Sequence, residues 1–152
     1  MWTVDHHGES TAQPATVYAL LADTARWAEW NDGVRSIELD GPFAAGTTAT
    51  MVLPDGTSLP FRLAWVDPAR GFEDVTEVPD AGVVVRVAHL LEPRTGGGTR
   101  ITYRCTVEGP DEVGAEVGPA VSGDFPDVIA ALSKRAARTE AIEAAAQAES
   151  VG

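Results

Sequence analysis

Strand-like alternation of apolar and polar residues fills most of the first two thirds of the chain. The clearest run is 99–109, in which one face is apolar and the other is polar or charged. Its apolar face comprises Ile101, Tyr103, Cys105 and Val107. Further strands are expected at 2–9, 34–40, 47–53, 59–67, 72–78 and 83–92. Short turns rich in Gly, Pro and Asp separate these runs, so we expect an antiparallel meander.

The same alternation assigns an inward face to three further strands. In 83–92, Arg86 and Glu92 mark the solvent side, and the strands 59–67 and 72–78 are assigned by the same parity rule. The inward residues are then Val85, Val87, His89 and Leu91 in the first strand, Phe61, Leu63 and Trp65 in the second, and Phe72, Asp74 and Thr76 in the third.

Three glycines, Gly96-Gly97-Gly98, lie between the last two strands and are expected to form their hairpin turn. Folded about this turn, the hairpin places His89 opposite Tyr103, with Cβ atoms about 5 Å apart. A register shifted by two residues is the alternative. The other inward pairs expected are Leu91 with Ile101 and Val87 with Cys105.

Helical periodicity is found between the first two strands and again after the last strand. Pro14 suits the first turn of a helix that runs to Asp23. The segment TARWAEWNDG, residues 24–33, suggests a second short helix packed by the rings of Trp27 and Trp30. We therefore expect two short helices between the first and second strands.

The stretch from Asp124 to about Arg138 has the pattern of a capped amphipathic helix. Asp124 is a good N-cap, and Pro126 lies in the first turn, where its missing N–H costs nothing. The apolar face of this helix consists of Phe125, Val128, Ile129, Leu132 and Ala136. Such a face needs a large apolar partner, so we expect a curved sheet around this helix. A cavity between them would have Phe125 and Ile129 as its ligand-facing helical residues.

The regions beside this helix are less regular. Several Gly and Pro residues interrupt 111–123, which we interpret as an irregular or short helical lead. Farther on, Glu140 and Glu143 fall on what had been the apolar face. We therefore expect the helix to leave the sheet there, with residues about 139–152 forming an exposed tail of a single domain that spans 1–152.

Composition narrows the possible functions. A formal net charge of −12 argues against binding nucleic acid, whose phosphates require a basic surface, and against anionic membranes. No apolar run approaches the roughly 18 residues of a membrane span, and no basic-then-apolar leader is present. The single cysteine, Cys105, excludes an internal disulfide. We expect a cytoplasmic protein that is a monomer or a homodimer.

His89 is the leading candidate for chemistry. An inward histidine opposite Tyr103 suits general acid-base catalysis of ring closure or dehydration beside a carbonyl. The alternative is a core histidine satisfied by Tyr103 or by backbone. Asp74 is a second acid or base if it points inward, and otherwise an edge carboxylate in water. Cys105, expected to be buried, is not a candidate nucleophile, and no residue spacing indicates a metal site or a cofactor.

Five segments stand in a characteristic order and spacing. They are VYALLADTARWAEWNDGV (17–34), GPFAAGT (41–47), LEPRTGGGTRITY (91–103), VEGP (107–110) and DFPDVIAAL (124–132). In these segments the chain resembles the polyketide cyclase/dehydrase-like branch of the SRPBCC superfamily, the START and Bet v 1-like ligand-binding proteins. The resemblance implies an α+β helix-grip fold. In that fold a seven-stranded antiparallel sheet wraps around a long C-terminal helix, and two short helices follow the first strand.

The resemblance also implies a deep pocket for a small hydrophobic, polyketide-like molecule, with cyclisation or dehydration as the reaction and no cofactor. A non-catalytic carrier or sensor of a lipid-like or aromatic molecule is the alternative. Aromatase members place an arginine in the pocket from the strand corresponding to 59–67, whereas Arg62 alternates outward here. The candidate catalytic residues are His89, Tyr103 and Asp74. The expected pocket residues are Trp30, Phe61, Leu63, Trp65, Phe72, Val87, Leu91, Cys105, Phe125 and Ile129.

Overall fold

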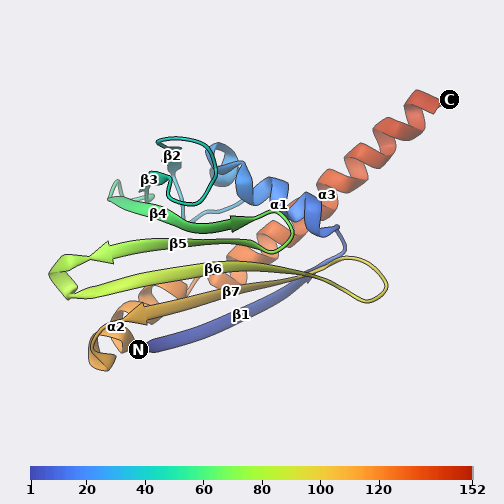
Figure 1. Cartoon of the computed structure of the whole chain (residues 1–152). Helices are drawn as coiled ribbons and strands as arrows, with labels where there is room; N and C mark the ends of the chain where they lie inside the picture. Colours follow the sequence, from blue (N-terminus) through green and yellow to red (C-terminus); the bar gives the residue numbers. More distant parts are fainter. Residues whose placement is uncertain (152) are drawn as a thin grey trace.

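A computed structural model describes residues 1–151, with side chains described through residue 149. Its core is one antiparallel sheet of seven strands in the order β1-β7-β6-β5-β4-β3-β2 (Figure 1). The strands are β1 (Trp2–Ser10), β2 (Ser36–Leu39), β3 (Thr48–Val52), β4 (Ser58–Asp67), β5 (Gly71–Val78), β6 (Val83–Pro93) and β7 (Thr99–Glu108). The N-terminal strand β1 therefore pairs with the last strand, β7. The strands from β2 to β7 follow one another in sequence order as a meander.

Helices cover one face of this sheet. The first pair, α1 (Pro14–Ala22) and the short η1 (Thr24–Glu29), follows β1, and a single turn, η2 (Pro79–Ala81), joins β5 to β6. The last pair is α2 (Asp111–Ser122) and the 27-residue α3 (Phe125–Val151). Figure 1 shows α3 crossing the sheet and its C-terminal end extending well beyond it. This arrangement is the helix-grip fold, as predicted, and no helix in the part of the chain described here is long and apolar enough to cross a membrane.

The hairpin of β6 and β7 adopts the register expected from the sequence. His89 pairs with Tyr103, Val87 with Cys105 and Leu91 with Ile101. All six side chains are buried, with 7% or less of their surface exposed. The next strand, β5, adds Phe72 opposite His89 and Asp74 opposite Val87. The inward parity predicted for 72–78 therefore places Phe72, Asp74 and Thr76 on the same face as His89.

A β-bulge in β4 changes the face of one predicted pocket residue. Leu63 pairs with Asp74, but the register then shifts, and Trp65 pairs with Glu73. The extra residue inverts the alternation, so Trp65 lies on the outer face of the sheet. There the guanidinium of Arg70 lies 5.8 Å from its ring centroid. The prediction that Trp65 points into the pocket is therefore wrong.

The segment 111–123 is more regular than the sequence suggested. It forms the 12-residue helix α2, with Pro119 inside the helix. Gly114 and Gly118 are needed for packing, because a Cβ at either position would collide with the Trp2 side chain. The glycines that we expected to interrupt a helix instead allow α2 to pack closely against β1.

The C-terminal helix grips the sheet through the predicted apolar face. Val128, Ile129, Leu132 and Ala136 are buried, and Ile129 packs so tightly on Gly8 that a Cβ there would collide with it. Glu140 is half-buried, and the described side chains from 141 onward are exposed. The helix therefore leaves the sheet close to the predicted position, although Glu140 is not free in solvent. Its carboxylate accepts hydrogen bonds from the Gln13 N–H at 2.7 Å and the Thr16 hydroxyl at 2.6 Å.

Candidate functional site: a pocket between the sheet and the C-terminal helices

A cavity of about 630 Å³ lies between the sheet, the η1–β2 loop and the two C-terminal helices. Apolar side chains make up most of its wall: Trp27, Val34, Met51, Leu53, Leu59, Val78, Val85, Val87, Val117, Ala120, Val121, Phe125 and Val128. The polar side chains are few: Asn31, Asp74, Thr76, His89, Tyr103 and Asp124. A volume of this size and a mostly apolar wall with a few polar groups are typical of small-molecule sites.

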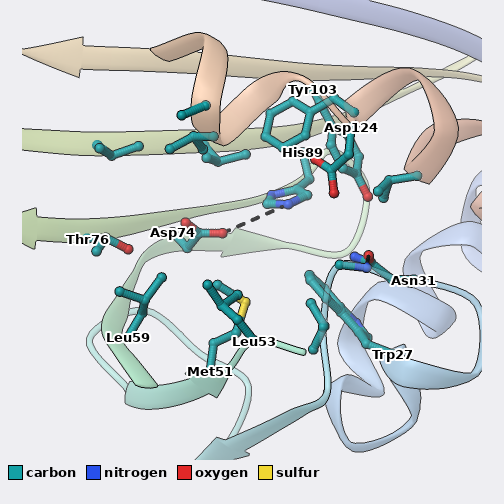
Figure 2. Close-up of a pocket in the computed structure, with 18 of the residues that line it drawn as sticks. Trp27, Asn31, Met51, Leu53, Leu59, Asp74, Thr76, His89, Tyr103 and Asp124 are labelled. Carbon is teal, nitrogen blue, oxygen red and sulfur yellow. Dashed lines mark hydrogen bonds and ion pairs between the residues drawn. The ribbon is translucent and has the colours of Figure 1, made fainter. Parts of the chain in front are cut away.

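Three titratable residues share one wall of the pocket because they come from three adjacent strands. Asp74 lies on β5, His89 on β6 and Tyr103 on β7, and the strand register brings them side by side. Figure 2 shows Asp74 and His89 in contact on this wall, with Leu59, Met51 and Leu53 across the pocket. The structure thus brings together the three residues that sequence reasoning singled out for chemistry.

His89 is held tightly in the wall. Its ring stacks on Phe72, with centroids 4.0 Å apart and planes inclined by 8°, and meets the edge of Tyr103 at 4.4 Å. Its Nε2 lies 3.9 Å from Oδ2 of Asp74, and its Nδ1 has no hydrogen-bond partner. Burial lowers the pKa of His89 to about 3, because the charged imidazolium would lose its hydration. The imidazole is therefore neutral at neutral pH.

Asp74 is the group in this wall that titrates near neutrality. Burial raises its pKa to about 7, and the nearby charge of Glu73 adds to the shift. The exposed fraction of the Asp74 side chain is 20%, whereas that of the His89 side chain is 4%. Asp74 is thus the member of the pair that is accessible from the pocket, and it exchanges a proton in the range where a catalytic acid or base operates.

Tyr103 places an unpartnered hydroxyl in the pocket wall. The residue is 2% exposed, and its hydroxyl has no hydrogen-bond partner. Burial raises its pKa, and the charges of Asp74 and Asp124 raise it further. The phenol therefore stays protonated and is able to donate a hydrogen bond to a ligand oxygen.

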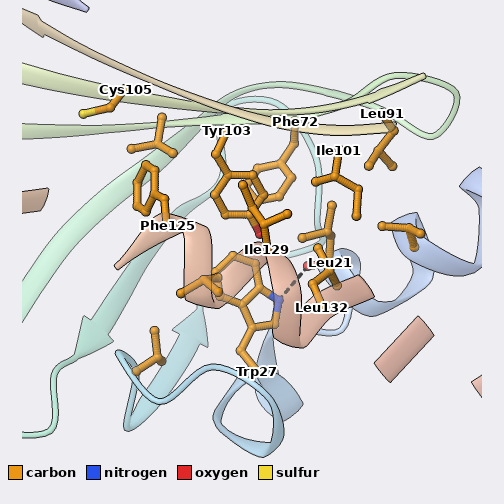
Figure 3. Close-up of a cluster of buried hydrophobic side chains, with 14 of the residues drawn as sticks. Leu21, Trp27, Phe72, Leu91, Ile101, Tyr103, Cys105, Phe125, Ile129 and Leu132 are labelled. Atoms are coloured by element: carbon orange, nitrogen blue, oxygen red, sulfur yellow. Dashed lines mark hydrogen bonds between the residues drawn. The ribbon is translucent and has the colours of Figure 1, made fainter. Parts of the chain in front are cut away.

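Sequence reasoning missed the mouth of the pocket. Asp124, expected only as a helix N-cap, is exposed there, and Asn31 and Trp27 line the same region. Trp27 is held by a hydrogen bond from its indole N–H to the Leu21 carbonyl at 2.9 Å (Figure 3). The η1–β2 loop meets the α2–α3 junction only in three dimensions, so no local sequence signal predicted this contact.

The expected pocket residues divide into three groups. Val87 and Phe125 line the cavity itself. Phe61, Leu63 and Phe72 line a smaller void of about 30 Å³ that shares Trp27, Met51, Asp74 and Thr76 with the main cavity. The remaining five, which lie outside both linings, are Trp30, Trp65, Leu91, Cys105 and Ile129.

Four of these five belong to the solid core instead. Trp30 packs against Trp27 with ring centroids 5.5 Å apart. Leu91, Cys105 and Ile129 are buried in the hydrophobic cluster that joins α3 to the sheet (Figure 3). Burial raises the pKa of Cys105 to about 11, so the thiol is not an activated nucleophile. Ile129 faces Gly8 of β1, so Phe125 and Val128 replace it as the residues of α3 that line the cavity.

Two further features bear on possible chemistry. Arg62 is exposed, so it lies outside the pocket, as its parity indicated. Within residues 1–151, no group of three or more histidine, cysteine or acidic side chains is placed to hold a metal ion.

One protein family and several solved structures are similar to this chain. A family described as "Polyketide cyclase / dehydrase and lipid transport" matches residues 1–137. Norcoclaurine synthase from Thalictrum flavum, solved as a point mutant with a transition-state analogue, superposes with a TM-score of 0.75 at 15% identity. That superposition covers 91% of this chain and 96% of the synthase chain.

Two further solved structures give similar results. A Thermobifida fusca protein solved by NMR has a TM-score of 0.73 and 22% identity, covering 91% of this chain and 95% of its own. The di-domain ARO/CYC BexL of the BE-7585A biosynthetic pathway has a TM-score of 0.73 and 17% identity, covering 88% of this chain and 46% of its own. At these identities the likeness shows the fold alone. No curated protein is detectably similar in sequence.

Proposed function

The chain belongs to the polyketide cyclase/dehydrase and lipid transport family, and we propose that its pocket binds a small hydrophobic, polyketide-like molecule and promotes its cyclisation or dehydration. The observation that carries this proposal is the placement of Asp74, His89 and Tyr103 together on one wall of a cavity whose other walls are almost entirely apolar. The apolar walls bind the body of the ligand, and the polar wall acts on its functional groups.

Asp74 is the proton carrier of the proposed reaction. In a β-hydroxyketone, its carboxylate removes the proton between the carbonyl and the carbinol carbon. The electrons of that C–H bond form the new double bond, the C–O bond breaks, and the leaving hydroxyl takes the proton from Asp74 and departs as water. A carboxyl with a pKa of about 7 suits both halves of this cycle, because it accepts and returns a proton readily at neutral pH.

The other two residues support this step in different ways. The Tyr103 hydroxyl, which has no protein partner, donates a hydrogen bond to the carbonyl oxygen as enolate charge develops. His89 is a positioning residue, since its neutral ring lies beside the Asp74 carboxyl, with Nε2 3.9 Å from Oδ2, and has little exposure of its own. The sequence-based choice of His89 as general acid or base is thus replaced by Asp74.

Ring closure uses the same groups. Asp74 removes a proton beside one carbonyl, and the resulting enolate carbon attacks a second carbonyl of the same chain. The new alkoxide then receives the proton, so no atom is gained or lost by the protein. A mostly apolar cavity favours this outcome because it holds the chain in a folded conformation.

Turnover of a defined probe tests the proposal. A naphthyl β-hydroxyketone is a suitable probe for a mostly apolar cavity of about 630 Å³, and its dehydration to the conjugated enone is followed by absorbance. Replacing Asp74→Asn is expected to lower the first-order rate about 100-fold, the usual scale for loss of a general acid or base. His89→Gln is expected to lower the rate less and to move its pH profile, because this substitution changes the surroundings of Asp74.

The matched control is Asp80→Asn, which changes an exposed aspartate on η2. Equal rates in Asp74→Asn and the unmodified protein would refute the catalytic assignment.

A non-catalytic carrier is the second candidate, and one observation favours it. The His89 Nδ1 and the Tyr103 hydroxyl are enclosed almost completely, which suits a wall that only contacts ligand. The carrier function predicts that native mass spectrometry of the purified protein shows a bound small molecule that stays intact on incubation. It also predicts no dehydration of the naphthyl probe above the rate in buffer.

A further inference from the structure

The charged groups that line the pocket are all acidic. Asp74 lies inside the cavity and Asp124 at its mouth, and no lysine or arginine of the described residues lines it. The outer face of the sheet is different, because there Asp5 pairs with Arg104, and Glu108 with Arg86. Asp124 has no ion-pair partner among residues 1–151. Partial burial raises the pKa of this carboxyl, and the nearby charge of Asp127 raises it further, so a cation bound beside it would offset both effects.

Hydrogen-bond acceptors converge at the same mouth. Oδ2 of Asp124 lies 2.6 Å, and Oδ1 of Asn31 3.2 Å, from the point where a Cβ on Gly33 would stand, so both oxygens lie beside this glycine. Oδ1 of Asn31 accepts a hydrogen bond from the Gly33 N–H at 2.9 Å and keeps a second lone pair for another donor. The buried Tyr103 hydroxyl, which lacks a partner, lies close enough for the Asp124 charge to raise its pKa. Figure 2 shows Asp124 and Asn31 at one end of the pocket and Thr76 at the other.

We propose that the ligand carries a protonated amine, and that its ammonium group binds at this mouth between Asp124, Tyr103 and Asn31. The apolar body of the ligand then extends inward past Asp74 toward Thr76. This inference rests on the proposed function to the extent that the cavity is the ligand site, and it adds the chemical class of the ligand.

The position of the ammonium follows from the cost of burying charge. A cation deep in the apolar half of the cavity would lose its hydration, whereas at the mouth it keeps part of it and gains an opposite charge. An ammonium has three N–H donors, which matches acceptors on Asp124, Tyr103 and Asn31. A ligand carboxylate would instead meet Asp124 as a like charge.

The arrangement assigns recognition of the cation and transfer of the proton to different carboxyl groups. Asp124 binds the cation at the mouth, and Asp74 remains free on the inner wall for proton transfer. The two carboxyls come from different elements, Asp124 from the α2–α3 junction and Asp74 from β5. They can therefore be removed one at a time.

Three probes with one apolar body test the inference: naphthylethylamine, naphthylethanol and naphthylacetate, each titrated calorimetrically near neutral pH. The amine is expected to bind about fivefold more tightly than the alcohol, the scale of a partly exposed ion pair, and the carboxylate most weakly. Asp124→Asn removes the charge at nearly constant side-chain size and is expected to bring the amine and the alcohol to equal affinity. Asp127→Asn removes the same charge from the exposed first turn of α3 outside the lining, and the preference for the amine is expected to remain.

The outcomes separate the two proposals. Equal affinity for the amine and the alcohol in the unmodified protein overturns the amine inference while leaving the cavity as a ligand site. Persistence of the amine preference in Asp124→Asn also overturns it. Failure of all three probes to bind contradicts the cavity as a site for hydrophobic molecules, and so contradicts the proposed function itself. Asp74→Asn is expected to lower the rate of dehydration of the β-hydroxyketone about 100-fold while preserving the preference for the amine.

Discussion

Nε2 of His89 lies 3.9 Å from Oδ2 of Asp74, and burial shifts the pKa values of the two residues in opposite directions. Burial lowers the histidine pKa from 6.5 to about 3 and raises the aspartate pKa from 3.8 to about 7. The folded protein at mildly acidic pH therefore holds a neutral carboxylic acid beside a neutral imidazole. The unfolded chain holds a carboxylate and an imidazolium instead. Each state carries one proton on the two residues.

The first prediction concerns the pH dependence of stability. Between 3.8 and 6.5 the pair contributes no slope in the unmodified protein, because folded and unfolded states bind equal numbers of protons. In Asp74→Asn only His89 remains, and the unfolded state binds the extra proton. Stability relative to the unmodified protein then falls as the pH drops below 6.5. In His89→Gln only Asp74 remains, the folded state binds the extra proton, and relative stability falls as the pH rises from 3.8 toward 7.

Urea unfolding across this pH range measures both slopes. Each variant is expected to depart from the unmodified protein by up to about 1.4 kcal/mol per pH unit, with opposite signs. All other titrating groups are common to the three proteins, so they cancel in the comparison. Parallel curves for all three proteins would show that the two pKa values are not shifted as described.

The sequence predicted the strand faces correctly wherever alternation was unbroken. Parity in 83–92 and 99–109 was enough to place His89 beside Tyr103, and parity in 72–78 placed Asp74 on the same wall. Parity failed at Trp65, because a single extra residue after Leu63 inverts every later position of that strand. Nothing in the alternation itself marks such a bulge.

The helical half of the site was less predictable. An amphipathic pattern shows which residues of a helix are buried, but it does not distinguish packing against the sheet from lining a cavity. Ile129 and Phe125 share one helical face, yet Ile129 meets Gly8 and Phe125 borders the pocket. The placement of Asp124 against Gly33 depends on how the η1–β2 loop meets the α2–α3 junction, which is information held by the tertiary structure alone.

Glu140 provides the second prediction. Its carboxylate accepts hydrogen bonds from the Gln13 N–H and the Thr16 hydroxyl, so it caps the N-terminus of α1 from α3. Glu140→Ala is expected to lower the free energy of unfolding by about 0.5–2 kcal/mol, the scale for loss of an N-cap. Glu143→Ala, on the exposed part of the same helix, is expected to change it by less than about 0.5 kcal/mol. Chemical denaturation of both variants measures the difference, and equal effects would contradict a capping role.

The third prediction tests the docking of α2 on β1. A Cβ at Gly118 would collide with the Trp2 ring, so Gly118→Ala is expected to cost about 1–3 kcal/mol, although alanine favours helix. In a Trp2→Ala background the same substitution is expected to be neutral or stabilising, because the obstacle is gone. A double-mutant cycle measured by urea unfolding gives this coupling. Additive effects of the two substitutions would mean that the ring and the helix do not meet.

The fourth prediction addresses whether the cavity is the ligand site. Val117 of α2 is half-buried and lines the cavity, so Val117→Phe projects a ring into space that is already empty. Because this space accepts the ring without displacing core side chains, stability is expected to stay within about 1 kcal/mol of the unmodified protein. Affinity for naphthylethanol is expected to fall by about tenfold or more, since ring and ligand compete for the same volume. Ala115→Phe adds the same ring to the exposed side of α2, outside the lining, and is expected to leave affinity unchanged. Calorimetric titration of both variants measures these affinities. Unaltered affinity in Val117→Phe would show that the ligand binds somewhere other than this cavity.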